Sequence, residues 1–394
     1  MQVETSAFPA FYGLRGIGLQ DIYLDNSATT RVCDQAVKRM VQVMTVSYGN
    51  PSSLHQKGIE AEDEMDRARR AVADRLGCME REIVFTSGGT EANNLALFGG
   101  AAAKKRAGKR IVVTQLEHSS VYETSDALER QGFEVVRLVP GPDGKIPTGS
   151  IYEAVNQDTI LVSMMLVNNE TGAIQPVEQM QKAVKKAGAP ALIHCDAVQA
   201  FGKMPCRPAA LGVDLMTISS HKIHGPKGAG ALYIRKGARI LPRQYGGSQE
   251  QGIRPGTEGV PAIAGFGAAV EALGDVTQHA TQASKLWDAL YKAAEAMPGV
   301  RINSPEDALP YVFNLSVEGV RSETMLHFLA QKGIYVSSGS ACSKGALSRP
   351  LTAMGLSRKT VDSALRVSFS RFNRMEHVEA LVEGIEEGIA RLRK

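Results

Sequence analysis

The sequence predicts an α/β protein with a mostly parallel central sheet flanked by helices, joined to a smaller α+β domain. Between residues 82 and 235, short apolar or β-branched runs alternate with helix-like stretches, which is typical of a sheet with helices on both faces. The run TILVSMMLV (159–167) is almost entirely apolar, as expected for a strand covered on both sides. Near residue 260 the alternation ends and a long helical stretch begins.

The expected elements follow one another along the chain. The strands of the central sheet are expected at 82–87, 110–115, 133–139, 159–167, 191–196, 214–219 and 230–235. Helices are expected at 90–108, 120–132 and 176–188, and one long or broken helix at 259–297. The smaller unit should contain strands at 312–319 and 364–372 and a helix at 322–333.

This pattern suggests three segments. Residues 1–20 form an N-terminal extension that we expect to be loosely ordered, and residues 21–270 form the large domain. Residues 271–394 form the small domain, which carries a cysteine in a Gly/Ser-rich loop. The first part of the large segment, through IYLDNSATT, can pack with either unit.

The bulk properties exclude several classes of protein. A chain of 394 residues is longer than a single hydrophobic core usually accommodates, so we expect two domains. A net charge of +4 gives no reason to expect a nucleic acid or membrane partner. No apolar stretch reaches the roughly 18 residues that a membrane span needs, and the N-terminus lacks the features of a signal peptide. The five irregularly spaced cysteines favour reduced thiols in the cytoplasm.

Polar residues follow several of the predicted strands. Gly89 and Thr90 lie in the turn SGGT before a helix, where free N–H groups can bind a phosphate. A tight turn with Thr90 as an ordinary N-cap explains the same residues equally well. Asp196 ends an apolar strand and Gln199 follows; the carboxylate either caps the next turn or faces a protonated heterocycle.

Three more strand ends carry His118, Asn169 and Lys222, the last within SSHKIHGPKGAGALYI. Each has an ordinary explanation, such as a solvated lysine or a satisfied histidine. Ligands of open α/β sheets, however, gather outside the carboxyl ends of the strands, so their common position indicates a site. The histidine and cysteine spacings match no standard zinc pattern, and we expect no metal.

Together these motifs resemble the cysteine desulfurases of the class V aminotransferase family, which have fold type I and use pyridoxal 5'-phosphate. The resemblance spans residues of about 22 to 372 and rests on YLDNSATT, YGNPSSLH, FTSGGTEANNLAL, EHSSV, VNNETGAIQPV, HCDAVQAFGK, SSHKIHGPKGAGALY, GGSQEQGIRPGTE and SSGSACS. It implies that Lys222 binds the cofactor as a Schiff base, which requires a neutral amine, and then carries the Cα proton. Asp196 would pair with the pyridinium nitrogen.

The resemblance assigns the remaining cofactor contacts as well. Gln199 would bond the ring hydroxyl, His118 would stack on the ring and assist proton transfer, and Asn169 would contact cofactor and substrate. The phosphate would be held by Thr90, Ser219, His221 and the helix N-terminus at Gly89. Thr257, in RPGTE, would reach the phosphate of a neighbouring subunit, which implies a homodimer.

Two residues of the small domain complete the expected site. Arg366 lies on a strand where Leu365 and Val367 face the other side. It is either an exposed strand arginine or, as the resemblance implies, the clamp for the substrate carboxylate. Cys342 lies in a Gly/Ser-rich stretch that should be mobile and accessible, as a nucleophilic thiol requires. The 24 residues from Cys342 to Arg366 are slightly fewer than in the housekeeping members of the family.

The resemblance implies a homodimeric cytoplasmic cysteine desulfurase that converts L-cysteine to L-alanine and forms a persulfide on Cys342. The sulfur acceptor would be an iron–sulfur scaffold or a tRNA-thiolation enzyme, and a thiamine-pathway protein is a further possibility. A selenocysteine lyase or another class V pyridoxal-phosphate enzyme is the nearest alternative. A non-catalytic protein that binds a nucleotide phosphate through SGGT is a more distant one.

Overall fold

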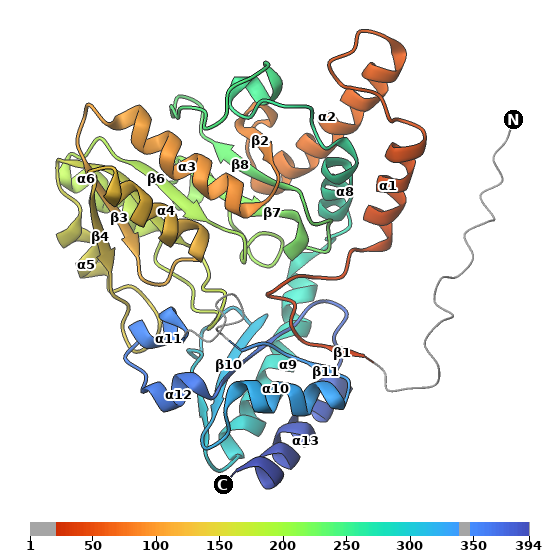
Figure 1. The fold of residues 1–394 in the computed structure, drawn as a ribbon, viewed down its shortest axis with the longest axis vertical. Coiled ribbons are helices and arrows are strands. Elements are labelled where there is room, and N and C mark those ends of the chain that lie inside the picture. Colours follow the sequence, from red (N-terminus) through yellow and green to blue (C-terminus); the bar gives the residue numbers. More distant parts are fainter. Residues whose placement is uncertain (1–20, 339–346, 394) are drawn as a thin grey trace, which may run out of the picture.

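The computed structural model of the chain describes residues 21–338 and 347–393, and it confirms the predicted α/β fold (Figure 1). The main sheet has the strand order β2-β8-β7-β6-β5-β3-β4. Strands β3 to β7 pair in parallel, whereas β8 runs antiparallel to both of its neighbours. The strands are β2 (Ile83–Thr86), β3 (Arg110–Thr114), β4 (Glu134–Leu138), β5 (Thr159–Met165), β6 (Leu192–Asp196), β7 (Leu215–Ser219) and β8 (Gly230–Ile234).

Helices cover both faces of this sheet. On one face α3 (Gly89–Lys104) and α4 (Ser119–Arg130) pack in a cluster that includes Leu161. On the other face the cluster includes Val162, the next residue of β5. Successive side chains of a strand point to opposite faces, so a strand between two helical layers must be apolar on both. The second layer contains α1 (Asp34–Thr45), α2 (Gln56–Leu76), α5 (Thr148–Ala154), α6 (Glu178–Ala187) and α8 (Val260–Glu271).

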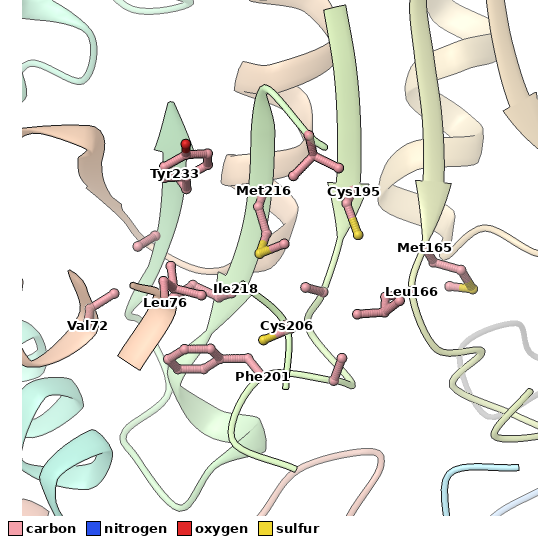
Figure 2. Packing of buried hydrophobic residues seen from close by; sticks show 14 of the residues in the cluster. Val72, Leu76, Met165, Leu166, Cys195, Phe201, Cys206, Met216, Ile218 and Tyr233 are labelled. Carbon is pink, nitrogen blue, oxygen red and sulfur yellow. The ribbon is translucent and has the colours of Figure 1, made fainter. Parts of the chain in front are cut away.

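Figure 2 shows the interior of the second cluster near α2. Phe201 and Cys206, from the segment after β6, lie close to Ile218 of β7 and Leu76 of α2. Short helices at Glu80–Glu82, Pro208–Leu211 (α7) and Gln249–Gly252 complete the large unit. The segment between β6 and α7 is therefore held by apolar packing on the sheet.

The smaller unit is built on an antiparallel sheet with the order β12-β10-β9. Its cluster joins Trp287 and Phe313 to Leu365. The N-terminal arm packs here, because β1 (Ile22–Tyr23) pairs with β11 (Ile334–Tyr335) and Leu24 belongs to this cluster. The other elements are α9 (Val276–Ala296), β9 (Val300–Ile302), β10 (Val312–Val317), α10 (Ser322–Gln331), α11 (Arg349–Ala353), α12 (Arg358–Asp362), β12 (Ala364–Ser368) and α13 (Met375–Leu392).

The helical stretch expected at 259–297 is broken into α8 and α9, which meet at 78°. Gly274 has a φ of +58° there, a value that favours glycine, and the Asp275 carboxylate accepts the Thr277 N–H to begin α9. The domain boundary near residue 270 stays a prediction. Within the described residues no single helix is long and apolar enough to span a membrane, and only this bent pair reaches that length and hydropathy together.

Candidate active site

The carboxyl ends of the parallel strands carry the residues that the sequence singled out. Asp196 is the last residue of β6, and Lys222 ends the short 3-10 helix that follows β7. His118 caps α4 after β3. The pKa of His118 is influenced by the charges of both Asp196 and Lys222, so the three side chains lie in one electrostatic neighbourhood.

Asp196 is held by two donors. Its Oδ2 accepts the Asn93 Nδ2–H at 2.8 Å, and its Oδ1 accepts the Val198 N–H at 3.0 Å. The carboxylate is 5% exposed. A buried carboxylate with only these donors can still receive a bond from a protonated ring nitrogen. Asn93, which the sequence did not single out, fixes its orientation.

Asn93 also connects Asp196 to His118. Its Nδ2 donates to Ser120 Oγ at 2.8 Å, and Ser120 Oγ lies 2.9 Å from His118 Nδ1. The Ser120 N–H donates to the same ring nitrogen at 3.1 Å. Because Nδ1 accepts this bond, the neutral ring carries its proton on Nε2. Burial lowers the pKa of His118, and the charge of Lys222 lowers it further.

Lys222 is anchored by the N-terminal arm. Its ammonium donates to the carbonyl of Ser27 and to the carbonyl of Ala28 at 2.9 Å. Ser27 O also accepts from Gln199 Nε2 at 3.0 Å, and Gln199 Oε1 accepts from Lys203 at 3.0 Å. The segment DNSATT thus joins the site, although sequence reasoning assigned it no role.

One end of the site has the features of an anion cradle. Gly88, the N-cap of α3, has a φ of +153°, and no side chain caps this helix. A side chain at Gly89 would meet Val198 and Ser219, so the helix start lies against β7 and the segment after β6. The Ser219 hydroxyl is buried with no partner in the described part of the chain.

His221 and Thr90 lie at this end too. His221 Nδ1 lies 3.2 Å from Thr29 Oγ1, and burial, then Lys222, lowers its pKa to about 4. Thr90 is exposed in the first turn of α3. It is not the N-cap, since Gly88 occupies that position, so the alternative of an ordinary threonine cap is wrong.

Arg366 reaches the site from β12. Its Nη1 donates to Asn169 O at 3.1 Å, and its Nη2 donates to Asp25 Oδ1 at 2.8 Å. Only 5% of Arg366 is exposed, so the alternative of an exposed strand arginine is wrong. Arg366 Nε is buried and has no partner among the described residues. A guanidinium with this free N–H can bond a carboxylate in the site.

Two buried carboxyl groups lie near the site, and sequence reasoning gave neither of them a role, although Glu170 follows the same apolar strand as Asn169. Burial raises the pKa of Glu117 to about 8 and that of Glu170 to about 7. Glu117 Oε1 accepts from Thr114 and from the Met165 N–H. Glu170 Oε2 accepts from Ser348 Oγ at 2.5 Å, which ties the start of α11 to the end of β5. Neither stands in a charge pattern that would mark it in the sequence.

The cysteines of the described residues are unsuited to nucleophilic attack. Cys33, Cys195 and Cys206 are buried and Cys78 is half-buried. Figure 2 shows Cys195 and Cys206 among apolar side chains. Burial raises the pKa of Cys206 and of Cys78 to about 12, and that of Cys195 well above its usual value. The candidate nucleophile Cys342 lies outside the described residues.

Thr257 is not brought to this group. It is exposed and lines an open surface pocket of about 610 Å³, together with Arg243, Tyr245 and Gln249. No hydrogen bond within the described ranges joins it to the residues around Lys222. The expected contact of Thr257 with the phosphate of a neighbouring subunit stays a prediction.

The donor set fits the expected cofactor at both ends. The phosphate would meet an uncapped helix N-terminus and the unpartnered Ser219 hydroxyl. The ring nitrogen would meet the Asp196 carboxylate, and Lys222 supplies the amine. In the part of the chain that the structure describes, no three metal-binding side chains gather.

Comparison with known proteins gives a consistent result. The family model described as Aminotransferase class-V matches residues 22–381. A protein named cysteine desulfurase IscS, from Methanosarcina thermophila, is 40% identical over 376 residues, covering 94% of this chain and 93% of that protein.

Solved structures give the same picture. A NifS-like protein is 38% identical with a TM-score of 0.89, covering 94% of this chain and 100% of that one. A structure described as SspA in complex with cysteine is 31% identical with a TM-score of 0.79, covering 89% and 99%. The family match, over residues 22–381, includes the whole site from the N-terminal arm to β12.

Proposed function

This chain belongs to the aminotransferase class-V family and is a pyridoxal-phosphate-dependent cysteine desulfurase, and from this premise we propose that it moves the sulfur of L-cysteine onto Cys342. The relative from Methanosarcina thermophila is named a cysteine desulfurase, and one related structure is described with bound cysteine. The observation that carries the proposal is the convergence of Lys222, Asp196 and Arg366 from separate elements on one site.

The cofactor supplies an electron sink for charge that develops at the substrate Cα. The residues of the chain do the rest. Asp196, held by Asn93, would bind the ring nitrogen and keep it protonated. Lys222 would hold the cofactor through its amine and would carry the Cα proton of the substrate. Arg366 and Asn169 bind the carboxylate of the amino acid and fix its orientation.

The sulfur then moves to the enzyme. The Cys342 thiolate forms a bond to the substrate sulfur while the bond from that sulfur to Cβ breaks, and the electron pair left on carbon takes up a proton. The products are L-alanine and a Cys342 persulfide, and no external oxidant or reductant is required. We assign the proton exchange in this step to His118, whose neutral ring carries its proton on Nε2 because Nδ1 accepts the Ser120 N–H.

We infer that the active form is a homodimer in the cytoplasm. Thr257 is exposed and separate from the Lys222 site of its own chain, so we assign it to the phosphate of a partner. The free state of the described cysteines suits a reducing compartment. The persulfide passes to an acceptor protein, such as an iron–sulfur scaffold or a tRNA-thiolation enzyme.

Borohydride reduction tests the cofactor assignment. The purified protein should absorb visible light, and reduction should fix the cofactor to the peptide that contains Lys222. The Lys222→Ala variant should lose activity by orders of magnitude, because no neighbouring amine replaces the positioned one. A cofactor fixed to another lysine contradicts the assignment, and a colourless protein favours a nucleotide-binding role. Turnover of selenocysteine without cysteine favours the lyase alternative.

A further inference from the structure

Lys203 is a buried lysine next to the site that has no counter-ion. It is 6% exposed, and none of the ion pairs found in the described residues includes it. Lysine is almost never fully buried unless it is paired. The buried amine therefore needs an explanation beyond packing.

Among the described residues, the one hydrogen-bond partner of its amine is Gln199. The two residues lie four positions apart in a turn-rich segment after β6, where the Phe201 N–H donates to Ala197 O at 2.8 Å and the Met204 N–H donates to Ala200 O at 3.1 Å. This spacing places both side chains on one face of the turn. Lys203 Nζ lies 3.0 Å from Gln199 Oε1.

These contacts determine which way the Gln199 amide faces. A lysine ammonium can only donate, so Oε1 must face Lys203, and the Ser27 carbonyl can only accept, so Nε2 must face Ser27. The Ser27 carbonyl oxygen also accepts from Lys222. Because it is shared, it constrains the Gln199 amide less than Lys203 does. Without Lys203, the buried Oε1 would have no donor and the amide would gain a reason to rotate.

We propose that Lys203 is a positioning residue of the cofactor site, which holds Gln199 so that an N–H rather than a carbonyl oxygen faces the ring oxygen of the cofactor. The inference rests on the proposed function, because it concerns the cofactor contact proposed for Gln199. It adds a residue with no assigned role, and it connects Lys203 through Gln199 and Ser27 O to Lys222.

The electrostatic surroundings agree with this role. Burial, together with the charges of Lys222 and Arg366, lowers the pKa of Lys203 to about 7. The other groups around the small cavity beside it, of about 30 Å³, are His224, His279, Arg371 and the ring of Tyr311. No carboxylate lines this cavity. Charged or neutral, the amine retains an N–H for Gln199.

The test is a pH titration of the visible absorption band of the bound cofactor in Lys203→Met. Methionine is similar in length and cannot donate. A bond from Gln199 to the ring oxygen stabilises the deprotonated Schiff base, so its loss should raise the Schiff-base pKa. We expect an upward shift of roughly 0.5 to 1 unit, with near wild-type cofactor content per chain. Lys203→Arg, which keeps a donor, should titrate like the wild type.

A double-mutant cycle separates positioning from a direct charge effect. If Lys203 acts through Gln199, most of the shift should disappear when Lys203→Met is made in a Gln199→Leu background. An equal shift in both backgrounds, or no shift in either, overturns the proposal. If Lys203→Met fails to fold, the same titration is made with Lys203→Gln. The glutamine side chain is one bond shorter than lysine, so its amide nitrogen should not reach Gln199 Oε1. The titration needs bound cofactor but no turnover, so a failure of desulfuration is a separate result.

Discussion

Asn93 shows how one uncharged side chain organises the catalytic groups. It is 1% exposed on the sheet-facing side of α3 and donates to both Asp196 and Ser120. Ser120 in turn contacts His118. The orientations of the Asp196 carboxylate and of the His118 ring are therefore coupled through the single amide of Asn93.

Replacing Asn93 with alanine should impair catalysis more than folding. Asp196 loses one of its two donors and a small cavity opens, so we expect a loss of roughly 1–3 kcal/mol in the free energy of unfolding. We expect kcat/KM for L-cysteine to fall by about 10- to 100-fold, because the ring nitrogen is held less well. Steady-state kinetics and urea unfolding measure the two effects.

Asn94→Ala is the matched control. Asn94 is the next residue of α3, and within the described part of the chain its side chain bonds only the Thr90 carbonyl of its own helix. Its removal should change stability by no more than about 0.5 kcal/mol and leave kcat/KM near the wild-type value. Equal kinetic losses in the two variants would contradict the role assigned to Asn93.

Several of the site residues predicted from the sequence share one signal, which is a polar side chain at or soon after the end of an apolar strand. Asp196 and Lys222 carry this signal and the structure brings them together. The residues that hydrogen-bond to the predicted site residues lack this signal. Asp25 pairs with Arg366 across 341 positions, and such a contact leaves no local pattern in a single sequence. Asn93 could have been noticed as a polar residue on an apolar helix face.

At the scale of elements, α11 is fastened to the large unit by two residues at its start. Ser348 donates to Glu170, and Arg349 donates to the Glu117 carbonyl at 2.5 Å and stacks on Tyr122 with 3.6 Å from Cζ to the ring centroid. This attachment follows directly after the segment that carries Cys342. The buried Glu170 carboxyl makes it sensitive to pH.

Glu170→Gln should remove a pH-dependent loss of stability. The folded-state pKa of Glu170 is raised to about 7 from its usual 4.5. The folded protein therefore keeps this proton while the unfolded chain releases it, and stability falls as pH rises between those values. The unfolding free energy of the variant relative to wild type should increase from pH 4.5 to 7.5 by up to roughly 3 kcal/mol.

Urea unfolding at several pH values measures this difference. Glu383→Gln, at an exposed position of α13, is the control and should follow the wild type throughout. Other buried groups, such as Glu117, contribute equally to wild type and variant and cancel. The prediction is contradicted if the unfolding free energies of Glu170→Gln and wild type differ by the same amount at every pH from 4.5 to 7.5. Glu170 would then not be protonated in the folded protein at neutral pH.

The strands predicted for the main sheet are confirmed. They could be predicted because they are short, largely apolar runs that are bounded by turns. The direction of β8 was not predicted, since hydrophobic periodicity carries no information on whether a strand pairs in parallel. The break between α8 and α9 was left open because its cause, a glycine with positive φ followed by an aspartate cap, lies within an otherwise helical composition.

At the scale of the whole molecule, the main unresolved contact is that of Thr257. Its pocket is open to solvent and lined by residues of one surface segment, from Arg243 to Thr257. We propose that Thr257 of a second chain completes the phosphate site at the α3 N-terminus. The sequence suggests this only through the resemblance of RPGTE, because no property of a single chain indicates a contact between two.

Subunit complementation tests this arrangement. Lys222→Ala should be inactive, and Thr257→Asp should be nearly so because its carboxylate would repel the phosphate. Mixing the two variants under conditions of subunit exchange should restore up to about one quarter of wild-type activity, since half of the dimers then hold one site with both native residues.

The control mixes Lys222→Ala with the Lys222→Ala, Thr257→Asp double variant, in which no site has a native lysine. It should stay inactive. If subunit exchange is verified and the first mixture also stays inactive, Thr257 does not serve the partner's site.

The most direct test of the account is a single turnover with L-cysteine, followed by mass spectrometry of the protein and its peptides and by measurement of alanine. The account predicts one added sulfur atom on the peptide that contains Cys342, in step with alanine formation, and none on the other cysteines, whose thiols are buried or half-buried. Cys342→Ala should retain the cofactor and lose both signals by orders of magnitude. Alanine formed at a near-normal rate by Cys342→Ala, without persulfide on any residue, would contradict the account.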